Sequence, residues 1–138
     1  MLPLKDKRME KCQFQEMYPV YSREISKSGA GFPTLEGLCR YFCGQIEKHP
    51  FAQYIGTFDH YAHTVNIEGG EIEETIVGAK VVLFCFGKKL LDPRILSVRP
   101  RGIGVCETQT QYVVSFLEVP NASLTETMIK WVNVIDVR

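Results

Sequence analysis

Two of the chain's three histidines stand beside a carboxylate and a phenol in the segment FDHYAHT, residues 58–64. If this segment is a regular strand, His60 points to one face and His63 to the other, so the two imidazoles cannot bind one ion. If the chain instead turns near residue 60, Asp59, His60 and His63 converge on Zn²⁺ or Fe²⁺ as a two-histidine, one-carboxylate site. We expect the strand, which leaves Asp59, Tyr61 and His63 on one face as a polar row.

A carboxylate in this row would act on its neighbouring imidazole. Asp59 beside His63 would fix the tautomer of the ring and raise its basicity, as a general base requires. Structural pairs of this kind do the same without catalysis, and no nucleophile motif such as GxSxG occurs in the chain. The hypothesis of a hydrolase therefore has no nucleophile motif to support it.

A second concentration of polar groups is the basic segment, GKKLLDPRILSVRPRG, residues 87–102. The segment contains one carboxylate, Asp92, and five cations, which are Lys88, Lys89, Arg94, Arg99 and Arg101. A glycine at a strand end and the N–H groups of a helix start can receive a phosphate or a carboxylate. The segment lacks the GxxxxGK spacing of a phosphate-binding loop. Two interpretations stay open: a small-anion site, or a face paired across a dimer with the acidic segment EGGEIEE, residues 68–74.

The cysteines predict one candidate reactive thiol. Cys39 and Cys43 fall on the apolar stripe of a predicted helix, and Cys85 lies inside an apolar strand, so we expect unreactive core thiols there. Cys106 follows a pair of arginines whose charge would favour the thiolate. The odd count and irregular spacing suit a reducing compartment, and no CxxC pair predicts a zinc ribbon; the five positions are 12, 39, 43, 85 and 106.

Composition limits the classes of function. The 138 residues fit a single domain, and 45% hydrophobic with 23% charged residues is typical of a globular protein. Sixteen basic residues balance sixteen acidic ones, so we expect neither a nucleic-acid partner nor an anionic membrane surface. No run of eighteen apolar residues predicts a transmembrane helix, and the charged start predicts no secretory signal. We therefore expect a cytoplasmic protein.

Hydrophobic periodicity and capping signals predict the elements that carry these groups. After a polar lead-in, residues 1–18, they are a strand at 20–25, a loop at 26–34, a helix from Thr34 to His49, a strand at 51–65, an acidic loop at 67–75, a strand at 79–87, a short helix at 93–98, a hairpin turning at 108–111 and a docked C-terminal helix at 123–136. The order predicts an α+β fold. Its largely antiparallel four- to five-stranded sheet would be covered by two longer helices and one short helix.

Three local signals are the basis of these boundaries. The continuous apolar run at 79–87 is typical of a central strand covered on both faces. Ser123 with Glu126 forms a capping box at the start of the last helix. The hairpin lacks an Asn-Gly turn, so its register stays open.

Short motifs add a resemblance to a known family. With FDH at 58–60 followed by Ala62, VVLFCFG at 81–87 and a later strand ending in FLEVP, residues 20–120 resemble domain-of-unknown-function family 302, which has IDHAA and LLIFGNP strands at comparable places. The resemblance implies an α+β fold, a homodimer, occurrence in bacteria and archaea, and no established activity. It marks Asp59, His60 and Gly87 as matching positions without roles. The longer segments FDHYAHT, FCFGKKL and VRPRGIGVCET are similar to those of a separate uncharacterised bacterial family.

Together these features predict a non-catalytic protein that binds a small anion or a partner. Its pocket would lie between the row of Asp59, Tyr61 and His63 and the basic residues Lys88, Arg99 and Arg101. The alternative is a metal- or thiol-dependent enzyme that uses Asp59, His60 and His63, with Cys106 as a further candidate. No residue pattern names a cofactor.

Overall fold

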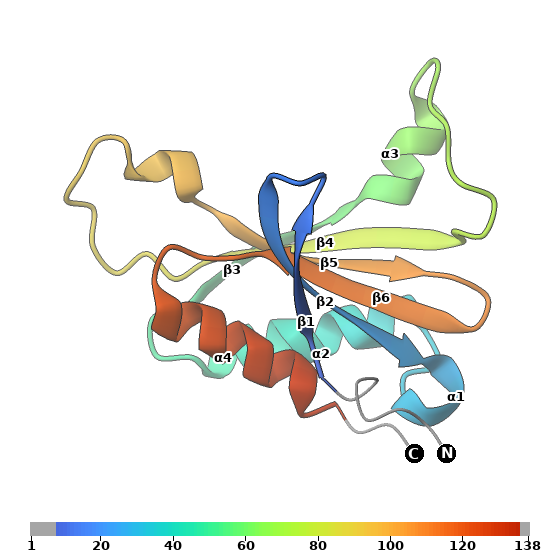
Figure 1. The fold of residues 1–138 in the computed structure, drawn as a ribbon, viewed down its shortest axis with the longest axis horizontal. Helices are drawn as coiled ribbons and strands as arrows, with labels where there is room; N and C mark the ends of the chain where they lie inside the picture. Colours follow the sequence, from blue (N-terminus) through green and yellow to red (C-terminus); the bar gives the residue numbers. More distant parts are fainter. Residues whose placement is uncertain (1–7, 136–138) are drawn as a thin grey trace.

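A six-stranded antiparallel sheet forms the centre of the protein (Figure 1). The computed structural model describes residues 8–135, with the side chain of residue 30 left aside. The strand order is β1-β2-β6-β5-β4-β3, and every neighbouring pair is antiparallel. The strands are β1 Glu10–Phe14, β2 Tyr18–Ser26, β3 Gln53–Asp59, β4 Gly78–Cys85, β5 Arg101–Glu107 and β6 Gln111–Leu117. The α+β class and the antiparallel sheet are confirmed, whereas the prediction of four to five strands was wrong.

Two long helices cover one face of this sheet (Figure 1). The helices are α1 Lys27–Ala30, α2 Leu35–Lys48, α3 His60–Asn66 and α4 Ala122–Asn133, with a 3₁₀-helix, η2, at Ile95–Val98. Buried Arg23 of β2 links α4 to the sheet, because its Nη1 donates to the carbonyl of Val132 at 2.5 Å. Trp131 of α4 contacts Phe84 of β4, with ring centroids 5.8 Å apart. The described residues therefore form two layers, a sheet and one layer of helices.

Side-chain alternation on the strands shows which face of the sheet is the core. On β4, Val82 and Phe84 are fully buried beneath the helices, while Val81 and Leu83 on the other face are only partly buried. The prediction that this strand is covered on both faces was therefore wrong, because α2 and α4 lie on the same side. The largest core side chains include Ile25, Leu38, Phe42, Ile46, Ile103, Tyr112, Val114, Met128 and Val132.

The predicted boundaries of α2 are confirmed, and those of α4 need a correction. Thr34 Oγ1 accepts a hydrogen bond from the Gly37 amide at 3.0 Å, and α2 ends before His49. In α4 the N-cap is Asn121, whose Oδ1 accepts from the Ser123 amide at 3.0 Å, so the predicted capping box does not start the helix. An amide side chain two positions earlier satisfies one of the free N–H groups of the helix start instead. The predicted last residue, 136, lies outside the described residues.

Strand β1 lies within the segment predicted as a polar lead-in. All five of its side chains are exposed, and Cys12 and Phe14 alone are apolar, so the segment has too short an alternation to predict a strand. Its turn into β2 contains Gln15 and Glu16 with positive φ, 53° and 60°, where a hairpin signal would have glycine or asparagine. Pairing with β2, from Glu10 opposite Ser22 to Phe14 opposite Tyr18, holds this edge strand in place.

The predicted strand at 51–65 is a strand followed by a helix. β3 ends at Asp59, whose Oδ1 accepts from the Ala62 amide at 2.9 Å and caps α3. An aspartate N-cap offers the chain a helical path that outweighs the β-propensity of the following residues. Smaller differences are a four-residue helix, α1, inside the predicted loop at 26–34, and η2 as a 3₁₀-helix at 95–98 in place of a helix at 93–98.

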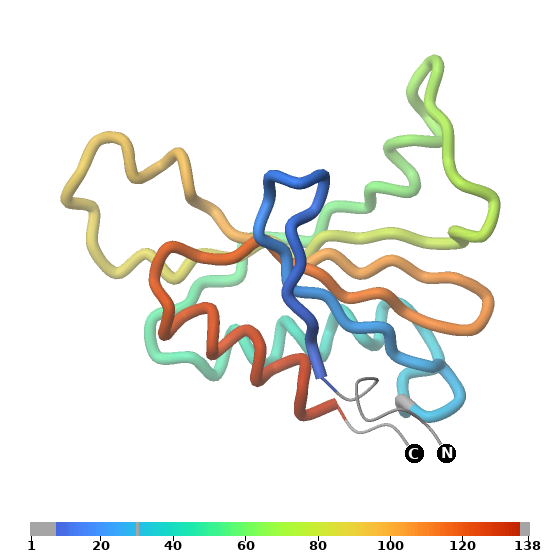
Figure 2. Tube along the Cα trace, in the orientation of Figure 1, coloured from blue at the N-terminus to red at the C-terminus, as the bar shows by residue number. Residues whose placement is uncertain are grey.

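The two predicted site regions lie at opposite ends of β4. Asp59 pairs with Lys80, whereas Arg101 pairs with Phe84, and those two partners on β4 are about 13 Å apart along the strand. The trace in Figure 2 shows the basic segment as a wide loop at one side of the molecule and α3 with its following loop at the other. Among the described residues, no helix is both long and apolar enough to cross a membrane.

Candidate functional site

The histidines sit on α3, where the turn at residue 60 brings their rings together. The ring centroids of His60 and His63 are 5.7 Å apart, and each lies 5.5 Å from the ring of Phe58. His60 Nδ1 is also 2.9 Å from Thr64 Oγ1 one turn later. The polar row of Asp59, Tyr61 and His63 does not form, because a helix replaces the strand that would have aligned them.

The Asp59 carboxylate does not join the two imidazoles. It caps the helix, as described above, and residues 8–135 contain no group of three or more His, Cys, Asp or Glu side chains placed to hold a metal ion. A paired imidazole without further ligands falls short of the three or four protein ligands that a zinc or iron site requires.

A shallow acidic pocket, defined here as the space beside Asp59, Glu36 and Glu107, lies at this end of β4. Its volume is about 370 Å³, and Tyr61 and Lys80 also line it. Two cations neutralise part of its charge. Lys80 Nζ lies 3.7 Å from Glu36 Oε2 and Lys27 Nζ lies 2.7 Å from Glu107 Oε2.

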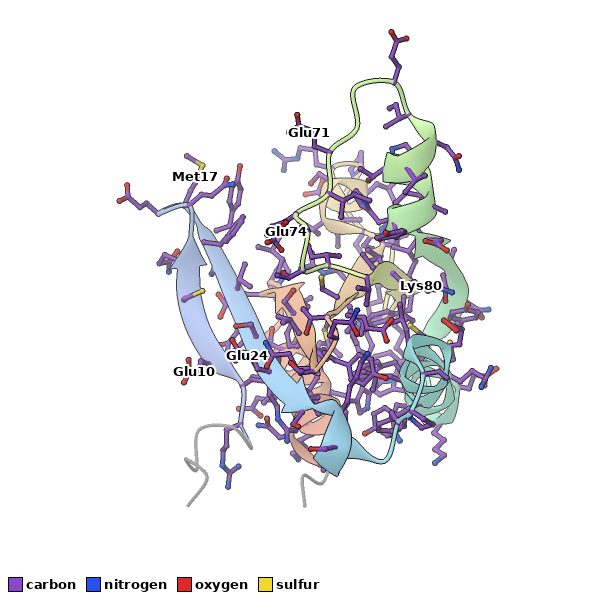
Figure 3. All side chains as sticks on the ribbon, turned by 90° about the vertical axis from the view of Figure 1, so that its right-hand side faces the viewer. Glu10, Met17, Glu24, Glu71, Glu74 and Lys80 are labelled. Atoms are coloured by element: carbon purple, nitrogen blue, oxygen red, sulfur yellow. The ribbon has the colours of Figure 1, made fainter. Side chains whose placement is uncertain are left out.

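More carboxylates surround this end of the molecule on the loop that follows α3. Figure 3, which faces this side, shows Glu71 and Glu74 on that loop and Lys80 on the strand beneath it. A pocket with so many carboxylates around it does not favour an anionic ligand.

The opposite end of β4 holds a larger pocket, the basic pocket, of about 440 Å³. Its volume falls within the range of about 300–1,000 Å³ that is usual for small-molecule sites. Four of the predicted cations line it, and none of its lining residues is acidic; the cations are Lys88, Lys89, Arg99 and Arg101. Apolar side chains from four parts of the chain complete its wall: Phe51, Phe86, Ile95, Val98, Val119 and Leu124.

Arg101 is the structural cation of the basic pocket. Its Nη1 donates to the Val98 carbonyl at 3.0 Å, and its Nη2 donates to the carbonyls of Leu117 and Glu118 at 2.9 Å each. Burial lowers the pKa of Arg101 from its ordinary value, but a guanidinium remains charged at neutral pH. Arg101 therefore joins the basic segment to the end of β6.

The remaining cations of the pocket face solvent or the cavity. Arg99 Nη1 donates to the Lys89 carbonyl at 2.7 Å, and Lys88 Nζ lies 5.5 Å from the centre of the Phe51 ring. The ion pairs found within residues 8–135 include none of the four lining cations. Arg94, outside the pocket, contrasts with them, because its Nη2 lies 3.1 Å from Asp92 Oδ2.

Gly87 makes room for one of these guanidinium groups. A Cβ atom at Gly87 would lie 2.6 Å from Arg99 Nη1 and 2.9 Å from Cys85 Sγ. Residue 87 must therefore lack a side chain if Arg99 is to keep this position. The packing gives a physical reason for the glycine that the sequence pattern marked without a role.

The structure divides the predicted pocket in two. Lys88, Arg99 and Arg101 come together as predicted, whereas Asp59 and Tyr61 line the acidic pocket at the far end of β4 and His63 lines neither. The sequence reasoning missed the apolar half of the basic pocket, together with Asn121 at the start of α4. Long-range packing brings these residues together, and no local pattern marks them.

Cys106 is not activated in the predicted direction. Burial, and to a smaller extent the charge of Glu73, raises the pKa of the Cys106 thiol above its ordinary value. Cys106 lies opposite Ala79 and Val113 near the acidic end of the sheet, away from the arginines that precede it in sequence. Burial also raises the pKa of the Cys39 thiol to about 11, in line with an unreactive core cysteine.

Comparison with known proteins places the chain in a family. Residues 9–137 match the model described as Family of unknown function (DUF6858). The chain belongs to this family. No curated protein and no solved structure matches the chain. Membership in the DUF6858 family agrees with the prediction of a domain from a family of unknown function. The resemblance to family 302 stays a prediction.

Proposed function

We propose that this DUF6858 protein is a non-catalytic binding protein whose basic pocket takes a small anionic ligand. The observation that carries the proposal is the concentration of four cations around one cavity, with no carboxylate in its lining. Like charges held together without counter-charges raise the local potential and attract an anion. The neutral net charge of the chain makes this concentration a local property of one end of the molecule.

The cations of the basic pocket differ in their hydrogen-bond partners, and this difference makes the proposal testable. Arg101 donates to three backbone carbonyls, whereas Arg99 donates from Nη1 to the Lys89 carbonyl and has further N–H groups that can bind a ligand. Guanidinium groups bind carboxylate and phosphate oxygens through two parallel hydrogen bonds. Arg99 is therefore the residue we expect to contact the anion.

A thermal-shift and calorimetric screen of phosphates, nucleotides and carboxylates tests this function. We expect at least one class to bind, and Arg99→Gln to weaken that binding about tenfold. Arg94→Gln is the matched control, because Arg94 belongs to the same loop and lies outside the pocket. A screen in which no anion binds would overturn the proposal, as would equal losses in the two variants.

Two further parts of the proposal concern the state of the protein. We propose a homodimer, supported by the acidic and basic segments at opposite ends of the sheet, which permit an antiparallel pairing of two copies. Sedimentation that finds only monomer at micromolar concentration contradicts it. We also propose a cytoplasmic location, supported by the five cysteines, all within the described residues and all free thiols.

The alternative of a metal- or thiol-dependent enzyme has less support from the geometry. Its carboxylate, Asp59, is engaged as a helix cap, and its thiol, Cys106, has a raised pKa. Elemental analysis of the purified protein, with a thiol titration, separates the two functions. Stoichiometric metal that is lost in His60→Ala would favour the enzyme.

A further inference from the structure

The structure points to a more specific ligand for the basic pocket: we propose an amphipathic monocarboxylate, an acid with one carboxylate on an apolar, ring-sized or alkyl body. This inference rests on the proposed anion-binding function and names its chemical class. The pocket has two different halves, and each half selects one part of such a ligand.

The apolar half suits a hydrocarbon body. Phe51 and Phe86 supply aromatic surface, and Leu124 from α4 with Ile95 and Val98 from η2 supply aliphatic surface. Phe86 is almost fully buried, and its ring stacks on the ring of Trp131 at a centroid distance of 5.7 Å, so packing in the core fixes its position. A rigid apolar wall of this kind gains binding energy from every apolar group that it removes from water.

Neutral polar groups are scarce on this wall. Asn121 is the one lining residue with a neutral amide side chain, and its Oδ1 already accepts hydrogen bonds from the amide and hydroxyl of Ser123. A sugar or a nucleobase needs several free donors and acceptors in its site. The lining therefore does not favour a nucleotide.

Several backbone donors around the pocket are engaged, which argues for a carboxylate over a phosphate. The Gly87 amide donates to Cys85 Sγ, and the Arg94 amide donates to Asp92 Oδ1. At the start of α4, the amides of Ser123, Leu124 and Thr125 all donate to oxygens of Asn121. Phosphate sites commonly use such N–H groups as a cradle. The side chains of Arg99, Lys88 and Lys89 are charged donors at this pocket, and together they suit one carboxylate.

The position of Lys88 links the two halves. Its ammonium lies over the Phe51 ring at 5.5 Å, at the border between the cations and the apolar wall. A carboxylate bound between Lys88 and Arg99 would direct its hydrocarbon body toward Phe51 and Phe86. Both groups of one small molecule can therefore be satisfied at once.

Calorimetric titration with phenylbutyrate tests the inference, with acetate, phenylbutanol, inorganic phosphate and ATP as comparison ligands. We expect phenylbutyrate to bind about tenfold or more tightly than acetate, which lacks the apolar body, and than phenylbutanol, which lacks the charge. Arg99→Gln should weaken phenylbutyrate about tenfold, whereas Arg94→Gln should leave it unchanged.

A second pair of variants tests the apolar half. Leu124→Ala should weaken phenylbutyrate several-fold and leave acetate unchanged, because it removes apolar contact only. Leu91→Ala is its control, since Leu91 is 81% exposed and outside the pocket. Circular dichroism of each variant confirms that a lost affinity is not a lost fold.

The outcomes separate this inference from the function on which it rests. Phosphate or ATP that binds through Arg99 while phenylbutyrate does not would overturn the inference and leave the anion-binding function standing. Phenylbutanol that binds as tightly as phenylbutyrate would also overturn it, because the charge would then have no role. If none of the anions binds, both proposals fall.

Discussion

The two ends of β4 carry opposite charges and use them differently. At the α3 end, the polar groups satisfy one another: Asp59 caps a helix, His60 contacts Thr64, and lysines neutralise Glu36 and Glu107. At the other end, four cations line a pocket without a carboxylate beside them. The comparison teaches that residue types suggest chemistry at both ends, whereas only the basic pocket collects charges of one sign without an opposite charge in its lining.

The largest expected effect concerns the cation that builds the basic end. Arg101→Ala should lower the free energy of unfolding by about 3 kcal/mol, because three carbonyls lose a charged hydrogen-bond donor. Urea unfolding followed by circular dichroism measures the change. It sharpens the comparison by separating a structural cation from the ligand-binding ones.

Arg94→Ala is the control for this experiment. Arg94 lies on the same loop, with its side chain 89% exposed and paired to Asp92, so its loss should leave the unfolding midpoint unchanged within error. Hydrogen bonds from the side chain and then the backbone of Arg94 hold the pKa of Asp92 below its ordinary value, but both groups face solvent. Equal destabilisation by the two substitutions would contradict the assignment of Arg101.

A smaller effect is expected at the opposite end. Asp59→Ala should destabilise the protein by about 1 kcal/mol, because the Ala62 amide loses its cap, while phenylbutyrate affinity stays unchanged. Asp59→Asn should retain most of the stability, since asparagine is an equally good N-cap. A loss of ligand affinity in Asp59→Ala, measured by calorimetry, would break the comparison by placing Asp59 in the binding site.

Local signals in the sequence predicted the elements whose side chains decide their own conformation. The Thr34 cap and the apolar stripe predict α2, and the alternation on both sides of residues 108–111 predicts the β5–β6 hairpin. β1 escapes this reasoning because its short, exposed segment has two apolar residues, too few to predict a strand, and pairing with β2 makes it one. α3 escapes it because one hydrogen bond to Asp59 outweighs a run of residues with β-propensity.

The candidate site was half predictable for a related reason. The cations Lys88, Arg99 and Arg101 are close together in the sequence, so their grouping in one pocket could be predicted from the sequence. Phe51 and Leu124 are distant from them in sequence, and only the order of strands and the docking of α4 bring them to the same pocket. The predicted link to Asp59 failed because strand register, which the sequence leaves open, sets the two ends about 13 Å apart.

Amide chemical-shift mapping during a titration with phenylbutyrate tests most directly whether the basic end binds an anion. We predict that the largest saturable shifts fall on the amides of residues 86–101 and on the start of α4, with those of residues 59–66 unmoved. The largest shifts at 59–66, or no saturable shift at the basic pocket, would contradict the central claim.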